Sequence, residues 1–227
     1  MYFLRFFMSD YTVEILSANI SVGKFIADYR DAERIEGYCR SCPNYGRNWS
    51  CPPFHYDVEE LLRRYQFLLF VVLKVSPCNI DISSNDFEQY LLSERRRLEE
   101  RLRCLEDVYS GLSCDAGCCC RCHNDAYNGR TDEGEWQFVA ANACNRLVSK
   151  PCRFPHCMRP SLEAYGFDLD KAVRSLFCLP LLWTDAVGVH SLDASSISSL
   201  KSSVAVVNSA YRVCIGGLLH NNEVIKW

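Results

Sequence analysis

Apolar residues in this chain recur at spacings that predict both strands and helices. The segment 66–76 is a continuous apolar run with several β-branched or aromatic residues, which is typical of a central strand. Residues 11–17 alternate weakly between polar and apolar positions, so we expect an edge strand there. Two late strands are predicted at 204–207 and 211–219.

A helical spacing of apolar residues marks several other segments. The clearest is 86–109, where leucines and aromatic residues lie along one stripe and charged residues form a solvated face. A helix is also predicted after Ser21, which suits an N-cap. Another is predicted after Asp57, which forms a capping-box pattern with Glu60.

Two shorter helices follow in the C-terminal half. The first covers 161–165 and ends at Gly166, and the second begins after Asp168 or Asp170. Together these elements predict an α+β fold. We expect a small mixed sheet containing the strands at 67–76 and 211–219, with helices on one face and two cysteine-rich metal-binding loops brought together at one end.

Length and composition are those of an ordinary soluble protein. The chain has 227 residues, of which 48% are hydrophobic and 23% charged, so 1–227 is expected to form a single metal-binding domain with its own core. Residues 1–7 are interpreted as an upstream extension, because Met8 is a plausible start.

The charge and hydropathy of the chain bear on whether it binds nucleic acid or a membrane. The net charge of −3 gives no general attraction to nucleic acid or to an anionic membrane. The arginines at 95–97 alternate with glutamates and are interpreted as the solvated face of a helix. The longest apolar run, 67–73, is too short to cross a bilayer, and no secretion signal is visible. We therefore expect a cytoplasmic protein.

Cysteine is the outlier of the composition. The chain has 15 cysteines, an odd number that excludes complete internal disulfide pairing. In a reducing cytoplasm these side chains remain available as thiolates, which bind metal. The sequence therefore indicates a metal-binding protein.

Four cysteines in the second half have the spacing of a metal site. Cys119 and Cys122 form a C-x-x-C pair, and Cys144 and Cys152 return after a polar insertion at 123–143. Four thiolates complete either a tetrahedral zinc site or a [4Fe–4S] cluster.

Other donors near this group remain as alternatives. Cys118 and Cys120 share the loop, but they flank Cys119 and would tend to point away from it. The remaining spare donors are Cys114, Cys157, His123 and His156.

The first group supplies three candidate ligands, Cys39, Cys42 and Cys51. The fourth position is then either open, as catalysis or substrate binding at a metal requires, or closed by a ligand from elsewhere in the chain. The sequence favours neither alternative.

Three residues between these cysteines are candidates for contact with the cofactor. Tyr45 and Trp49 can cover the site and exclude water, and Arg47 can contact an anion or donate hydrogen bonds to sulfur. An enzyme with an open metal position would have a pocket near Cys51 lined by these three side chains. Arg47→Ala would then impair activity without loss of metal.

Beyond the cysteines, Arg159 and Glu163 stand four residues apart. They are expected to pair across one helical turn or to face the metal loop, because Cys152 lies just before them.

At these residues the chain resembles a family of cysteine-rich predicted metal-binding proteins, a domain of unknown function. The resemblance rests on C-x-x-C-P-N-Y-G-R-N-W-S-C-P-P-F at 39–54, and on P-C-R-F-P at 151–155 followed by R-P-S-L-E-A-Y-G at 159–166. It implies the same seven cysteine ligands and a metal, and it implies no reaction. The chain departs from the family between Cys122 and Cys144, where the family loop is short.

Three functions are consistent with these residues. The first is an iron–sulfur protein with a redox or electron-transfer role and a redox partner protein, which the number of thiols favours. The second is a zinc-binding structural or interaction module, because zinc takes the same ligands. The third is a metalloenzyme that uses an open position at the site of Cys39, Cys42 and Cys51.

Overall fold

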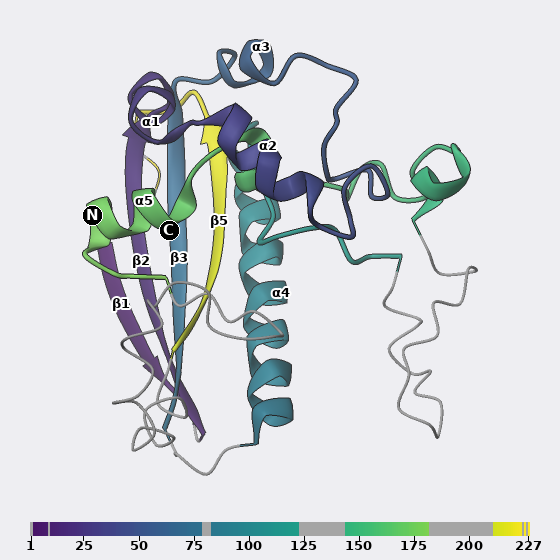
Figure 1. Cartoon of the computed structure of the whole chain (residues 1–227). Coiled ribbons are helices and arrows are strands. Elements are labelled where there is room, and N and C mark those ends of the chain that lie inside the picture. The colour runs from purple at the N-terminus through teal and green to yellow at the C-terminus, as the bar shows by residue number, and fades with distance from the viewer. Residues whose placement is uncertain are drawn as a thin grey trace, which may run out of the picture.

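The computed structural model describes residues 2–8, 10–78, 83–122, 144–181, 211–223, 225 and 227. Its centre is a five-stranded sheet in the order β1-β2-β3-β5-β4, and every neighbouring pair is antiparallel (Figure 1). The strands are β1 (Tyr2–Phe7), β2 (Tyr11–Ser21), β3 (Phe67–Pro77), β4 (Leu112–Cys114) and β5 (Arg212–His220).

The α+β class is confirmed, with two corrections to the sheet. The sheet is antiparallel throughout its described strands, whereas a mixed sheet was expected. β2 is not an edge strand, because β1 pairs along its outer side. The strand predicted at 211–219 corresponds to β5, and the one predicted at 204–207 lies outside the described residues.

Four of the predicted helices are present close to their expected positions, as α1 (Val22–Tyr29), α3 (Val58–Leu62), α4 (Ser84–Tyr109) and α5 (Leu169–Phe177). A further helix, α2 (Ala32–Arg40), was not predicted and begins at its own cap, Asp31. Two short 3₁₀ helices, η2 (Asn145–Val148) and η3 (Glu163–Tyr165), lie between α4 and α5. Figure 1 shows α4 running alongside the strands.

Helices cover both faces of the sheet, which corrects the expectation of one covered face. On one face, Leu68, Phe70 and Val72 of β3 share a core with α1 and α5. On the other, Val71 and Leu73 share a core with α4. Because β3 is buried on both sides, it needs apolar residues at every position, which explains its continuous apolar run.

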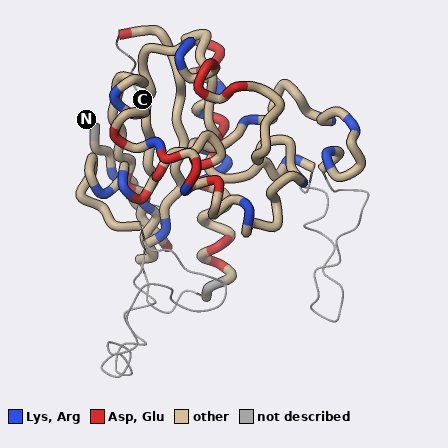
Figure 2. The backbone as a smooth tube through the Cα atoms, turned by 45° about the horizontal axis from the view of Figure 1, so that its top comes forward, with Lys and Arg blue, Asp and Glu red and all other residues tan. Residues whose placement is uncertain are grey.

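Acidic and basic residues are interspersed along the described chain (Figure 2). On α4 they are not all solvated, because Glu94 and Glu99 are buried. Glu94 accepts a hydrogen bond from Tyr11 at 2.7 Å, and Glu99 pairs with Arg95 at 2.8 Å.

Asp168, one of the two residues predicted as the cap, caps α5 and provides a first test of the fold. Its carboxylate accepts a hydrogen bond from the Lys171 N–H at 2.9 Å and pairs with Arg34 of α2. Asp168→Ala should reduce the free energy of unfolding by about 1 kcal/mol through loss of the cap, measured by urea denaturation. Glu33→Ala, which changes an exposed acidic residue of α2, is the control.

The pH dependence of that difference follows from the carboxyl pKa. Partial burial opposes ionisation of Asp168, but the Lys171 N–H and Arg34 outweigh it and lower the pKa below the usual 3.8. Since the folded-state pKa is lowered, the stabilisation is fully present above the unfolded-state pKa of this carboxyl group and is lost as the pH falls through the folded-state pKa. If the difference in free energy of unfolding between the wild-type protein and Asp168→Ala grew on acidification, this capping role would be contradicted.

Candidate metal centre

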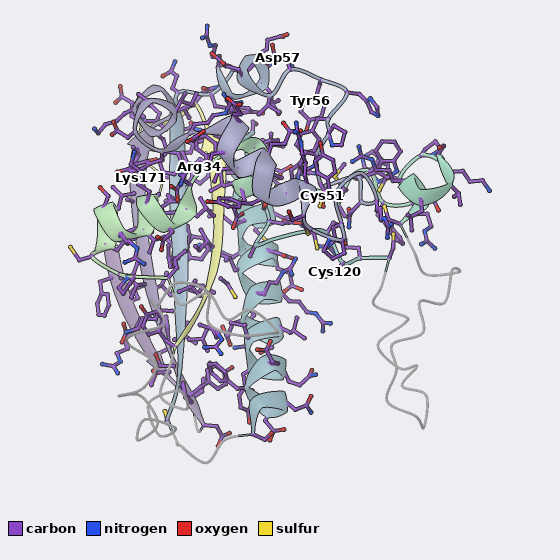
Figure 3. The ribbon with its side chains drawn as sticks, viewed as in Figure 1. Arg34, Cys51, Tyr56, Asp57, Cys120 and Lys171 are labelled. Carbon is purple, nitrogen blue, oxygen red and sulfur yellow. The ribbon has the colours of Figure 1, made fainter. Side chains whose placement is uncertain are left out.

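The first cysteine group begins in the last turn of α2, and the second follows strand β4. Cys39 lies in the last turn of α2, and the Cys42 N–H closes a turn onto the Cys39 carbonyl at 2.9 Å. β4 ends at Cys114, and the chain turns at Gly117, whose φ of +85° favours glycine. Figure 3 shows Cys51 and Cys120 on the same side of α4, each within its own loop.

Hydrogen bonds join the two loops directly. The Asn48 side chain donates to the Cys119 carbonyl at 2.7 Å, and the Cys119 N–H donates to Ser50 Oγ at 2.8 Å. Asn48 Oδ1 also accepts from the N–H and hydroxyl of Ser50, at 3.0 Å each. Both Asn48 and Ser50 are buried. The expected convergence of the cysteine loops is therefore confirmed, and these two residues, unassigned from the sequence, make the connection.

The four cysteines selected by spacing in the second half line one pocket. Cys119, Cys122, Cys144 and Cys152 share its wall with the amide of Asn48, and the other lining residues are Trp49, Phe154 and Met158. The pocket encloses about 10 Å³, close to the space that one water molecule needs. The structure thus brings the four residues together, and their role as ligands stays a prediction.

Within the described ranges, no three Cys, His, Asp or Glu side chains converge closely enough to hold one ion in the conformation shown. Coordination would therefore require the thiols on the pocket wall to turn toward a shared metal.

Hydrogen bonds to sulfur favour thiolate at two of these positions. The Phe154 N–H donates to Cys152 Sγ at 3.4 Å, and the Arg121 N–H lies similarly against Cys119. Burial nevertheless raises the pKa of Cys119 to about 12 and raises that of Cys152. Without a cation these thiols stay protonated at neutral pH, so metal binding must release protons.

The cysteines of the first loop lie near one another and near Cys118. Burial raises the pKa of Cys51 to about 12, and the next largest cause is the charge of Cys118, followed by smaller effects of Cys42 and Cys39. Burial also raises the pKa of Cys39, with Cys42 as the next cause. Cys118 was considered only as an alternate for the second group, and the structure places it beside the first.

The three residues proposed to contact a cofactor have different surroundings. Trp49 lines the second-group pocket and donates its indole N–H to the Lys150 carbonyl at 3.0 Å. The Tyr45 hydroxyl donates to Glu36 at 2.7 Å. Arg47 is exposed to solvent. Neither Tyr45 nor Arg47 lines the pocket that Trp49 lines.

Arg146 of η2 holds the first loop through its guanidinium group. It donates to the carbonyl of Asn48 at 2.8 Å and to the carbonyls of Cys51 and Pro53. Its guanidinium also lies over the Trp49 ring, 5.2 Å from the centroid. The segment between Cys144 and Cys152 is thereby docked on the first loop.

Two further arginines lie at the second cysteine loop. Arg95 of α4 donates to the Cys118 carbonyl at 2.6 Å. Arg121 Nε is buried and has no hydrogen-bond partner among the described residues. A metal held by four thiolates carries net negative charge, so the Arg95 guanidinium beside Cys118 fits such a donor set.

Arg95 makes a second test of the structure. Arg95→Ala removes the hydrogen bond to Cys118 and should lower metal affinity about 10-fold, as expected for a contact that positions a ligand. The affinity is measured by competition with a chelator. Arg101→Ala on the same helix is the control, because Arg101 is exposed. Equal metal affinities of Arg95→Ala and Arg101→Ala would show that Arg95 contributes no more to metal binding than an exposed arginine of α4 does.

A larger pocket of about 250 Å³ lies against Cys39. Its lining includes Arg30, Glu36 and Tyr56. Glu163 also lines it, and its Oε2 atom is buried without a hydrogen-bond partner in the described part of the chain. Burial raises the pKa of this carboxyl group.

The expected pairing of Glu163 with Arg159 is wrong. Arg159 instead forms a two-pronged ion pair with Glu106 of α4. Glu106 also accepts from the Ser113 N–H at 2.8 Å. The segment before η3 is not helical, so a spacing of four does not bring Arg159 and Glu163 together.

The sequence profile of the family described as "Predicted metal-binding protein (DUF2284)" matches residues 26–187. The chain belongs to this family. The matched range includes both cysteine groups. No curated protein and no solved structure matches the chain. Among the described helices of this family member, none is long and apolar enough to cross a membrane.

Proposed function

We propose that this protein is a cytoplasmic iron–sulfur protein that exchanges electrons with a redox partner protein. The observation that supports it most is the pocket lined by Cys119, Cys122, Cys144 and Cys152. Four thiolates are the usual ligand set of a [4Fe–4S] cluster, and the cluster would supply one-electron chemistry.

The surroundings of the pocket support the same proposal. Its wall contains thiols, one amide and the apolar side chains of Trp49, Phe154 and Met158, without carboxylate or imidazole groups among its lining residues. Apolar walls exclude water from a cluster, and N–H groups directed at sulfur adjust its reduction potential. The protein would hold the cluster, shield it and set its potential.

Anaerobic purification tests the proposal, with iron, zinc and acid-labile sulfide assayed beside a visible spectrum. Brown protein with matching amounts of iron and sulfide is the expected result. Colourless protein with stoichiometric zinc and no sulfide would contradict the electron-transfer role.

Zinc is the second candidate, and the size of the pocket favours it. A space of about 10 Å³ admits one ion, whereas a [4Fe–4S] cluster requires the cysteine side chains to swing outward. In that case the metal would tie together the loops and the segment 144–152, and the protein would serve as a structural or interaction module.

The metalloenzyme alternative is supported by the pocket against Cys39. It offers room for a small molecule, and the unpartnered Oε2 of Glu163 could contact it. This function requires an open metal position at Cys39, Cys42 and Cys51.

A further inference from the structure

The first loop contains only three of the four cysteines that a closed thiolate site needs. Its own cysteines are Cys39, Cys42 and Cys51, and the search for a fourth donor leads to the loop after β4. That loop crosses the first one at residues 118 and 119, where the connecting hydrogen bonds lie.

Cys118 presents its sulfur to the first loop. Asn44, two residues after Cys42, donates its side-chain N–H to Cys118 Sγ at 3.3 Å. Ser50, which precedes Cys51, accepts the N–H of the next residue, Cys119. The sulfur of Cys118 and the backbone that follows it therefore both contact the segment between Cys42 and Cys51.

Cys119 belongs to the other side of the same backbone. It lines the pocket with Cys122, Cys144 and Cys152, and Cys118 is not among that pocket's lining residues. The chain bends at Cys118, and the Cys118 sulfur contacts Asn44 while the Cys119 side chain lines the pocket. Two adjacent cysteines can therefore serve two different metal centres.

The backbone carbonyl groups of Cys118 and Cys119 are both held by hydrogen bonds. Arg95 donates to the Cys118 carbonyl at 2.6 Å, and Asn48 donates to the Cys119 carbonyl at 2.7 Å. With both peptide groups held, a rotation that exchanged the two sulfurs would break these hydrogen bonds. The directions of Cys118 and Cys119 are thus set by the surrounding structure.

We propose that Cys118 is the fourth ligand of the first metal centre, together with Cys39, Cys42 and Cys51. The protein then holds two complete four-thiolate centres joined by the peptide bond between Cys118 and Cys119. This inference rests on the proposed metal binding and goes beyond the seven ligands predicted from the sequence. It leaves no open metal position at the first centre, so it opposes the metalloenzyme alternative.

Metal content of serine variants tests the assignment in the full-length, anaerobically loaded protein. Cys118→Ser should lose about half of the bound metal, matching Cys39→Ser, while the neighbouring Cys120→Ser keeps all of it. The double variant of Cys118 and Cys39 should lose no more than either single variant. The double variant of Cys118 and Cys119 should lose the metal of both centres.

Two results would overturn the assignment. One is full metal content in Cys118→Ser. The other is a double variant of Cys118 and Cys119 that loses only as much metal as Cys119→Ser, which would place both thiols in one centre. A wild-type protein that binds no metal would contradict the proposed function itself, and that outcome is distinct from either.

Alkylation of the wild-type protein gives a readout that does not depend on folding of a variant. Iodoacetamide should label Cys118 only after a chelator has removed the metal, and should label Cys120 before and after removal. Fragment-ion mass spectrometry separates the two adjacent positions. Labelling of Cys118 in the fully loaded protein would contradict its role as a ligand.

Discussion

Cys119→Ser is expected to abolish metal binding at the second centre while the sheet and its helices remain folded. Serine is nearly the same size as cysteine, but its hydroxyl is a hard oxygen donor that stays protonated at neutral pH. It cannot replace the soft thiolate ligand. The loss of affinity should exceed the 10–100-fold cost of removing a supporting contact. Metal per protein, measured after gel filtration, gives the result, and circular dichroism reports whether the fold is retained.

The matched control is Cys104→Ser, an exposed cysteine of α4. It should keep the full metal content of the wild-type protein. Retention of all metal by Cys119→Ser would remove the second centre from the proposal. An equal loss from Cys104→Ser would show that metal binds to the cysteines of this chain without regard to position.

The second large effect is expected at Arg146. Its guanidinium donates to three carbonyl groups of the first loop, those of Asn48, Cys51 and Pro53. Lysine has one compact ammonium group and cannot reproduce this planar pattern of donors. Because hydrogen bonds from a charged group contribute about 1.5–3 kcal/mol each in favourable cases, Arg146→Lys should destabilise the loop by about 3 kcal/mol.

Hydrogen exchange of the first loop and the rate of metal loss to a chelator measure this effect. Both should rise in Arg146→Lys, since the loop opens more often. Lys150→Ala serves as the control, because the Lys150 residue is exposed and only its carbonyl contacts Trp49. Unchanged exchange in Arg146→Lys would mean that the loop is held by other contacts, such as those of Asn48.

Helices and strands could be predicted where the residues of one segment alone determine its structure. Helix α4 follows from its apolar stripe, and the capping roles of Asp57 and Asp168 follow from their side-chain chemistry. The burial of β3 on both faces was also implicit in its apolar run, although the expected arrangement covered only one face. What covers the second face depends on where α4 packs, which the pattern of β3 alone does not specify.

The candidate site shows a sharper limit. The spacing of Cys119, Cys122, Cys144 and Cys152 was enough to select four residues that line one pocket. The position of Cys118 could not be predicted, because it depends on Asn44, which is 74 residues away in sequence. Because Cys118, Cys119 and Cys120 are consecutive, their side chains are expected to point in different directions. The sequence does not show which of these side chains contacts the first cysteine loop.

Arginine 95 illustrates a limit of charge patterns. Its alternation with glutamates is typical of a solvated helix face, yet Arg95 contacts the Cys118 carbonyl and Glu99. The periodicity of α4 cannot tell which charged residues another segment will cover. Arg146 and Asn48 belong to no recognised ligand pattern, so their contacts across the loops are apparent only in the folded chain.

The buried Asn48 side chain has a consequence for how the protein fills with metal. It is bonded to both loops at once, so ordering one loop also orders part of the other. If both proposed centres bind metal, the second metal would bind to a site whose conformational entropy has already been reduced, which is positive cooperativity. By thermodynamic reciprocity each centre strengthens the other. With limiting metal, the population should therefore divide mainly between empty and doubly occupied molecules.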